Sequence, residues 1–148
     1  MSDFNVAITW QHAPRAGQPD DYSRAHQWTL AGDQTLHASA APDYAGDAGH
    51  TNPEEGLIAA VSSCHMLTFL AVAAKRGFKV SSYRDQASGT LAKNAQGRMA
   101  MTEVVLHPVI AFEGAAPGAE ELGKLHESAH RNCFIGNSIT AEVRVVTD

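Results

Sequence analysis

Hydrophobic and polar residues alternate in several short stretches near the start of the chain, and a period of two is typical of strands with one buried face. The stretches with this pattern are residues 4–10, 22–30 and 35–38. A tight turn is expected at residues 31–33. Residues 11–21 contain two prolines and a glycine and predict a loop, as do residues 42–51. The first third of the chain therefore predicts three strands.

The longest apolar pattern follows, between Asn52 and Gly77. Asn52 is a favoured N-cap, Pro53 suits the first helical position, and the two glutamates after it suit the positive end of the helix dipole. Lys75 lies near the other end, where Gly77 can take the left-handed conformation that ends helices. This segment predicts a long helix.

The uncharged stretch inside this helix, residues 57–74, reaches the lower limit of a membrane-spanning length. Polar side chains interrupt it at Ser62, Ser63, Cys64, His65 and Thr68. We therefore expect no membrane partner, and a helix in the core or at a subunit interface. A helix that is apolar on nearly every face must be covered on nearly every face, which a monomer of 148 residues does poorly. The pattern predicts a homodimer.

The second half of the chain predicts three more strands and one more helix. The strands are expected at residues 80–91, 99–112 and 139–146. A turn is expected at residues 94–97 and a helix at 119–132. The predicted order βββ–α–ββ–α–β separates strands from helices, which is typical of the α+β class. The length favours a single domain over residues 1–148.

Composition mainly excludes functions. The formal net charge is −5, and the lysines and arginines are scattered, which argues against a nucleic-acid-binding surface. The first residues lack a basic segment followed by an apolar one, so we expect no secretory signal and a cytoplasmic protein. Because cytoplasmic thiols stay reduced, a disulfide here would be transient and catalytic.

The chain contains two cysteines, Cys64 in the long helix and Cys133 after the second helix. They can be a redox pair, two inert core residues, or one ligand and one bystander. A free cysteine in an apolar helix usually serves packing, but the polar neighbours of Cys64 favour a reactive thiol. Glu54 precedes Cys64 by ten residues, about 15 Å along a continuous helix. It could contact Cys64 only from a partner chain whose helix packs antiparallel.

The segment His126–Glu127–Ser128–Ala129–His130 matches the H-E-x-x-H pattern. Two histidines four residues apart share one helix face and can bind zinc, with the glutamate as a general base. The third ligand would be Cys133 or the more distant His107. The alternative is that both histidines are half-buried residues on the face that leads to Cys133.

Three features together resemble the OsmC/Ohr family of thiol-dependent hydroperoxide reductases: the Asn-Pro-Glu helix start, Cys64 ten residues after the glutamate, and Cys133 after a second helix. The resemblance covers about residues 22–146. The stretches 22–28, 63–70 and 125–135 look like an OsmC-like branch of the family. Phe134 stands where better-known members have a proline.

The resemblance implies a role for four residues. Cys64 would attack the peroxide and become a sulfenic acid, and Cys133 would resolve it as a disulfide. Arg24 would stabilise the thiolate and bind the peroxide, and Glu54 would hold that arginine. A dithiol or a lipoylated protein would reduce the disulfide. The implied fold is an intertwined α+β homodimer, with no cofactor.

The sequence therefore favours a thiol peroxidase. Apolar neighbours of Cys64 favour organic hydroperoxides over hydrogen peroxide; these are Met66, Leu67, Phe69 and Leu70. Two alternatives remain open, a zinc-dependent hydrolase that uses His126, Glu127 and His130, and a non-catalytic OsmC-like protein that binds a small ligand.

Overall fold

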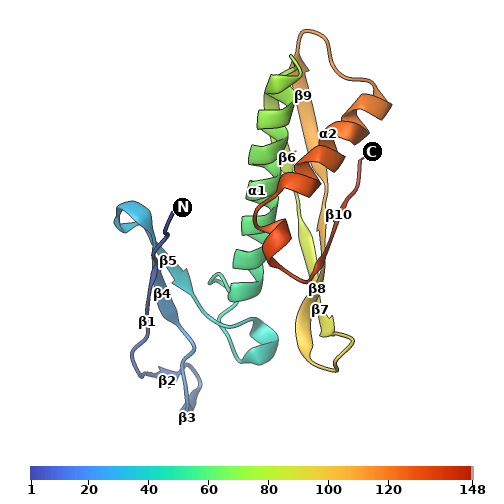
Figure 1. Cartoon of the computed structure of the whole chain (residues 1–148). Coiled ribbons are helices and arrows are strands. Elements are labelled where there is room, and N and C mark those ends of the chain that lie inside the picture. Colours follow the sequence, from blue (N-terminus) through green and yellow to red (C-terminus); the bar gives the residue numbers. More distant parts are fainter. Residues whose placement is uncertain (148) are drawn as a thin grey trace. The chain divides into compact units, whose positions relative to one another are not determined.

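A computed structural model describes residues 1–147. It contains ten strands, two α helices and three short 3-10 helices within those residues (Figure 1). Strands and helices occur in separate blocks along the chain, so the predicted α+β class is confirmed. The chain divides into two compact units, Met1–Gly56 and Leu57–Asp148. Each unit is described by itself.

The N-terminal unit is a three-stranded antiparallel sheet with an added hairpin. Strand β4 (His26–Thr29) lies between β1 (Ala7–Thr9) and β5 (Thr35–Ala38), and pairs Trp28 with Leu36. The turn before β5 is a 3-10 helix, η1 (Ala31–Asp33), and η2 (Pro42–Tyr44) lies in the second predicted loop.

The predicted loop at residues 11–21 is wrong, because this segment forms a hairpin of β2 (Pro14–Arg15) and β3 (Gln18–Tyr22). Gly17 between them has a φ of +74°, which suits glycine and makes the tight reversal possible. Prolines can lie in such a ribbon because each strand has an edge without ladder hydrogen bonds. The hairpin also shortens the next predicted strand, which begins at His26 instead of Tyr22.

Helix α1 (Pro53–Lys75) has the predicted bounds and the predicted caps. The Asn52 side chain accepts a hydrogen bond from the backbone N–H of Glu55 at 2.9 Å, and its own Nδ2 donates to Glu55 Oε1 at 2.7 Å. This reciprocal pair satisfies a backbone donor that the helix itself cannot satisfy. At the other end Gly77 has a φ of +83°.

We expect Asn52→Ala to lower the free energy of unfolding by about 1 kcal/mol, because the cap and its contact with Glu55 are both lost. Chemical denaturation at fixed protein concentration measures this change. Asn52→Asp retains a side-chain oxygen at the cap position and serves as the control. An alanine variant as stable as the wild type would contradict this assignment.

The C-terminal unit contains a two-stranded and a three-stranded sheet. Strand β6 (Lys79–Asp85) pairs antiparallel with β9 (Pro108–Glu113). Strand β8 (Met99–Leu106) lies between β7 (Ser88–Lys93), which is antiparallel to it, and β10 (Glu142–Val145), which is parallel.

Two predicted strands, residues 80–91 and 99–112, are each broken into two. One carboxylate marks both breaks: Asp85 ends β6, and its Oδ1 accepts a hydrogen bond from the backbone N–H of His107 at 2.7 Å. Residue 108 is a proline, which cannot donate to a ladder. The predicted alternation of strand groups and helices is therefore right. The groups before α1 and between α1 and α2 contain more strands than predicted.

Helix α2 (Ala119–Asn132) has the predicted bounds and packs against α1. Phe69 and Ala73 of α1 and Leu125 and Ala129 of α2 form one buried cluster. A second cluster joins Val61 of α1 to strand β8. Both clusters lie in the C-terminal unit.

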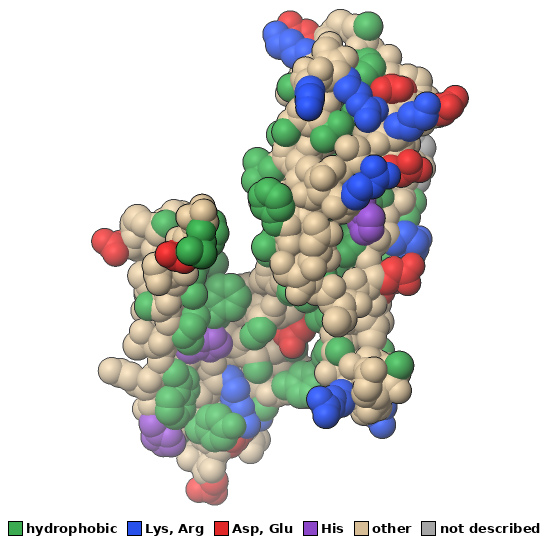
Figure 2. Space-filling view, in the orientation of Figure 1, with side chains coloured by type: hydrophobic (Ala, Val, Ile, Leu, Met, Phe, Trp, Pro, Cys, Tyr) green, Lys and Arg blue, Asp and Glu red, His purple; other side chains and the backbone are tan. Residues whose placement is uncertain are grey.

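Helix α1 is covered along a single stripe. Its buried residues are four apart along the chain: Val61, His65, Phe69 and Ala73. Leu67, on another face, is 60% exposed, and hydrophobic side chains lie on the surface of the C-terminal unit along α1 (Figure 2). By length and composition alone the helix could cross a membrane, but its buried stripe belongs to the core of this unit.

Candidate active site

The fold brings the two cysteines of the chain together. Cys64 lies in the middle of α1, and Cys133 is the C-cap residue of α2. Both are free thiols, and they lie close enough for each to shift the pKa of the other. Because α2 ends here, the backbone of the turn after it also faces the Cys64 thiol, through Phe134 and Ile135.

The surroundings of Cys64 favour its thiolate form. Partial burial opposes ionisation, but hydrogen bonds from the Ile135 backbone, the Cys133 thiol and the Phe134 backbone outweigh it and lower the pKa of Cys64 below its ordinary value. Backbone N–H groups at a turn are suited to hold an anion. Cys64 is also half-buried, so a small molecule can reach it.

Cys133 has the opposite character. Its thiol is 3% exposed, and burial raises its pKa above the ordinary value. The backbone N–H of Gly136 donates to Cys133 Sγ at 3.3 Å, and a Cβ at position 136 would lie 3.4 Å from that sulfur. Cys64 therefore ionises more readily than an ordinary cysteine, whereas the neighbouring Cys133 thiol stays protonated.

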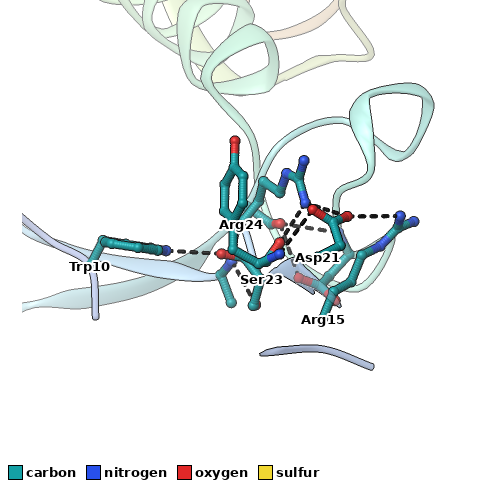
Figure 3. Close-up of polar contacts among 9 residues, drawn as sticks. Trp10, Arg15, Asp21, Ser23 and Arg24 are labelled. Atoms are coloured by element: carbon teal, nitrogen blue, oxygen red, sulfur yellow. Dashed lines mark hydrogen bonds and ion pairs between the residues drawn. The ribbon is translucent and has the colours of Figure 1, made fainter. Parts of the chain in front are cut away.

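Arg24 lies in the N-terminal unit and is held by its near neighbours in sequence (Figure 3). Its guanidinium pairs with Asp21 at 2.7 Å, donates to the Tyr22 carbonyl, and lies over the Tyr22 ring at 3.9 Å from the centroid. The hydrogen bond from Arg24 lowers the pKa of Asp21. Arg15 approaches the same carboxylate at 3.4 Å, so two cations share one anion.

Glu54 and Arg24 line one cavity of about 210 Å³ in this unit. Its other lining residues are His26, Ser39, Ala40, Ala41, Tyr44 and Pro53. The structure places both predicted residues on this cavity but pairs Arg24 with Asp21. Glu54 Oε2 is buried and has no hydrogen-bond partner within residues 1–147.

The zinc alternative loses its ligands. His126 is 5% exposed, and its Nδ1 shares a hydrogen bond of 3.0 Å with Nε2 of His65. Cys133, the nearest candidate for a third ligand, contacts Cys64. Across residues 1–147, no three histidine, cysteine, aspartate or glutamate side chains lie close enough to hold a metal ion.

The contact between His65 and His126 is the feature that sequence reasoning missed. One signal for it exists, because His65 lies on the same four-residue repeat as the buried residues Val61 and Phe69. The repeat predicts a buried histidine that needs a polar partner. It does not identify a partner from a different helix.

A family model and a solved structure that resemble this chain both belong to one family. The family described as OsmC-like protein matches residues 46–148. An OsmC-like protein of unknown function from Vibrio cholerae is 40% identical, covers 100% of both chains and has a TM-score of 0.91. No curated protein matches the chain.

Two more distant structures share the fold. An organic hydroperoxide resistance protein from Legionella pneumophila is 16% identical, with a TM-score of 0.74 over 100% of this chain and 99% of the other. The organic hydroperoxide resistance protein OhrB of Bacillus subtilis is 17% identical, with a TM-score of 0.70 over 98% of each chain.

Proposed function

Since the chain belongs to the family of OsmC-like proteins, we propose that it is a thiol-dependent peroxidase that reduces organic hydroperoxides through Cys64 and Cys133. The contact between these two thiols carries the proposal, because one has a lowered pKa and access while the other is buried and protonated. Proteins that share this fold are described as organic hydroperoxide resistance proteins.

The first step uses Cys64. Its thiolate attacks one oxygen of the hydroperoxide, the O–O bond breaks, and the alkoxide that leaves takes a proton to become an alcohol. Cys64 is oxidised to a sulfenic acid. The backbone N–H groups of Phe134 and Ile135 stabilise the thiolate before the attack.

The second step uses Cys133. Its sulfur attacks the sulfenic sulfur of Cys64, a disulfide forms and water leaves with the thiol proton. Because the thiols already contact each other, little movement is needed. A dithiol, or a lipoyl group on a partner protein, then reduces the disulfide by exchange and returns both thiols.

Arg24 and Glu54 complete the proposed site from a second copy of the chain. Glu54 is ten residues from Cys64 on a continuous helix, about 15 Å of rise, so it does not reach that thiol within one chain. The cavity that contains Arg24 and Glu54 would bind the peroxide, with Arg24 stabilising the anions. The uncovered faces of α1 support this homodimer, and the site would work in the cytoplasm.

The preference for an organic peroxide rests on apolar surface. Leu67, one turn after Cys64, is 60% exposed and can contact an alkyl chain. The cavity of the N-terminal unit adds Ala40, Tyr44 and Pro53. Phe69 does not contribute, because it is buried against α2.

The proposal is tested by treating reduced protein with one equivalent of cumene hydroperoxide. We expect the wild type to lose both free thiols and two hydrogen atoms of mass, as an intramolecular disulfide forms. Cys133→Ser should instead gain oxygen on Cys64, because the sulfenic acid has no partner. If both thiols of the wild type survive, the peroxidase proposal fails.

Arg24→Ala is expected to lower kcat/KM for cumene hydroperoxide by about 10²-fold, the usual loss when a charged group that stabilises developing charge is removed. Arg15→Ala is the matched control, because both arginines bind Asp21 but only Arg24 lines the cavity. Steady-state peroxide consumption measures both variants. Equal losses would show that the arginines act only through the fold.

A further inference from the structure

Helices α1 and α2 are joined by a buried polar contact next to the cysteines. His65 follows Cys64 directly, and its Nε2 lies 3.0 Å from Nδ1 of His126. The two rings are nearly parallel, at 9°, with centroids 5.3 Å apart. The side chains are 1% and 5% exposed. Two histidines are thus enclosed in an otherwise apolar helix contact.

The contact constrains the protons of both rings. A neutral imidazole has one N–H and one lone pair, so one ring must donate to the other across the inner edge. The outer nitrogens, His65 Nδ1 and His126 Nε2, are buried and have no protein partner within residues 1–147. Burial lowers the pKa of both histidines to about 4, so both are neutral at pH 7 and the hydrogen bond is intact.

The position of the pair links it to the redox thiols. His65 is adjacent to Cys64, and His126 lies two helical turns before Cys133. We propose that the His65–His126 hydrogen bond is a positioning device that fixes α2 along and around α1 so that the Cys133 thiol rests against Cys64. This inference rests on the proposed function, since it concerns how the disulfide forms.

Apolar packing cannot supply the same constraint. Phe69, Leu125 and Ala129 also hold the two helices together, and the Phe69 ring is 4.6 Å from that of His126. Hydrophobic contacts are non-directional, whereas a hydrogen bond weakens steeply when its angle or length changes. The histidine pair is therefore suited to set the register of α2, while the apolar cluster supplies adhesion.

The test is the equilibrium between the Cys64–Cys133 dithiol and oxidised glutathione, which takes the two electrons and the two thiol protons and becomes two molecules of reduced glutathione. This equilibrium requires no peroxide. We expect His126→Leu to lower the equilibrium constant for disulfide formation about tenfold, which corresponds to a change of about 30 mV in the reduction potential of the cysteine pair. The reason is that leucine fills space but cannot hydrogen-bond. We expect His126→Asn to stay within about threefold of the wild type, because the side-chain amide keeps a polar atom near Nδ1.

His130→Leu is the matched control, since it lies one turn later on α2 and is exposed. It should leave the equilibrium unchanged. If His126→Leu does not fold, His65→Leu removes the same hydrogen bond from the other side and is expected to show the same loss. A leucine variant equal to the wild type, or an asparagine variant worse than leucine, would overturn the inference.

These outcomes separate the inference from the proposed function. A wild type that forms the disulfide in glutathione buffer but does not consume cumene hydroperoxide would end the peroxidase proposal and leave the positioning role intact. A wild type that consumes peroxide while His126→Leu keeps the wild-type equilibrium would end the positioning role alone. A wild type that forms no disulfide in any glutathione buffer overturns the inference.

Discussion

Cys64→Ser is expected to abolish peroxide consumption, with kcat/KM for cumene hydroperoxide falling by about 10³-fold or more, as is usual when a covalent nucleophile is lost. The reason is electronic. A thiolate is the nucleophile in this chemistry, and the turn after α2 lowers the pKa of Cys64 toward that form. A serine hydroxyl in the same place stays protonated and cannot become a sulfenic acid.

The measurement is the rate of peroxide loss with dithiothreitol as reductant, followed for the wild type, Cys64→Ser and Cys133→Ser. The Cys133 variant should still consume peroxide in its first turnover, because Cys64 is intact. Free Cys133 should survive in Cys64→Ser, since burial keeps that thiol protonated. Substantial turnover by Cys64→Ser would mean that Cys64 is not the reacting group.

Acid is expected to destabilise the protein through its buried histidines. The pKa of His65 and that of His126 are both lowered from 6.5 to about 4 in the folded state, mainly by burial. Between these values the unfolded chain binds more protons than the folded one, so stability falls as pH falls. One such histidine accounts for about 2 kcal/mol between pH 7 and pH 5. Well above pH 6.5 the imidazoles are neutral in both the folded and the unfolded state, so this loss of stability is absent.

Urea unfolding between pH 7 and pH 4.5 measures this dependence. The double variant His65→Leu with His126→Leu should lose most of the slope, because it has no buried imidazole to protonate. Asp85 opposes the effect, since its charge raises the pKa of both histidines. Further titratable groups nearby are Cys64, Tyr83, His107, Glu127 and His130. An unchanged slope in the double variant would place the acid sensitivity elsewhere.

Local sequence signals predicted the helices well. Asn52, Pro53 and Gly77 are caps whose chemistry acts on adjacent residues, so the bounds of α1 could be read directly from the chain. The two prolines and Gly17 misled the prediction for residues 11–21, because the same residues that favour loops also occur in a short ribbon. The break after Asp85 depends on its contact with His107, which no local pattern shows.

The candidate site also contains residues that the sequence predicted and a contact that it did not. Both cysteines were evident from the sequence, and the family resemblance supplied their pairing. The Asp21–Arg24 contact is local, three residues apart, but that spacing predicts a contact only on a helix, and this segment is the end of a strand. The His65–His126 contact could not be predicted, because 61 residues separate its partners and only the packing of α2 on α1 brings them together. The literal match to a zinc motif drew attention to the wrong property of His126.

The parallel pairing of β10 with β8 has a consequence for the newly made protein. Parallel strands close long loops and form late in folding, and here the chain between them includes β9 and α2. Cys64 leaves the ribosome well before the segment that carries Cys133. Until α2 packs on α1, a nascent chain carries the Cys64 thiol without the Cys133 thiol that we propose as its resolving partner. We expect oxidant stress during synthesis to damage immature molecules by over-oxidation at Cys64, while mature molecules recover through the disulfide.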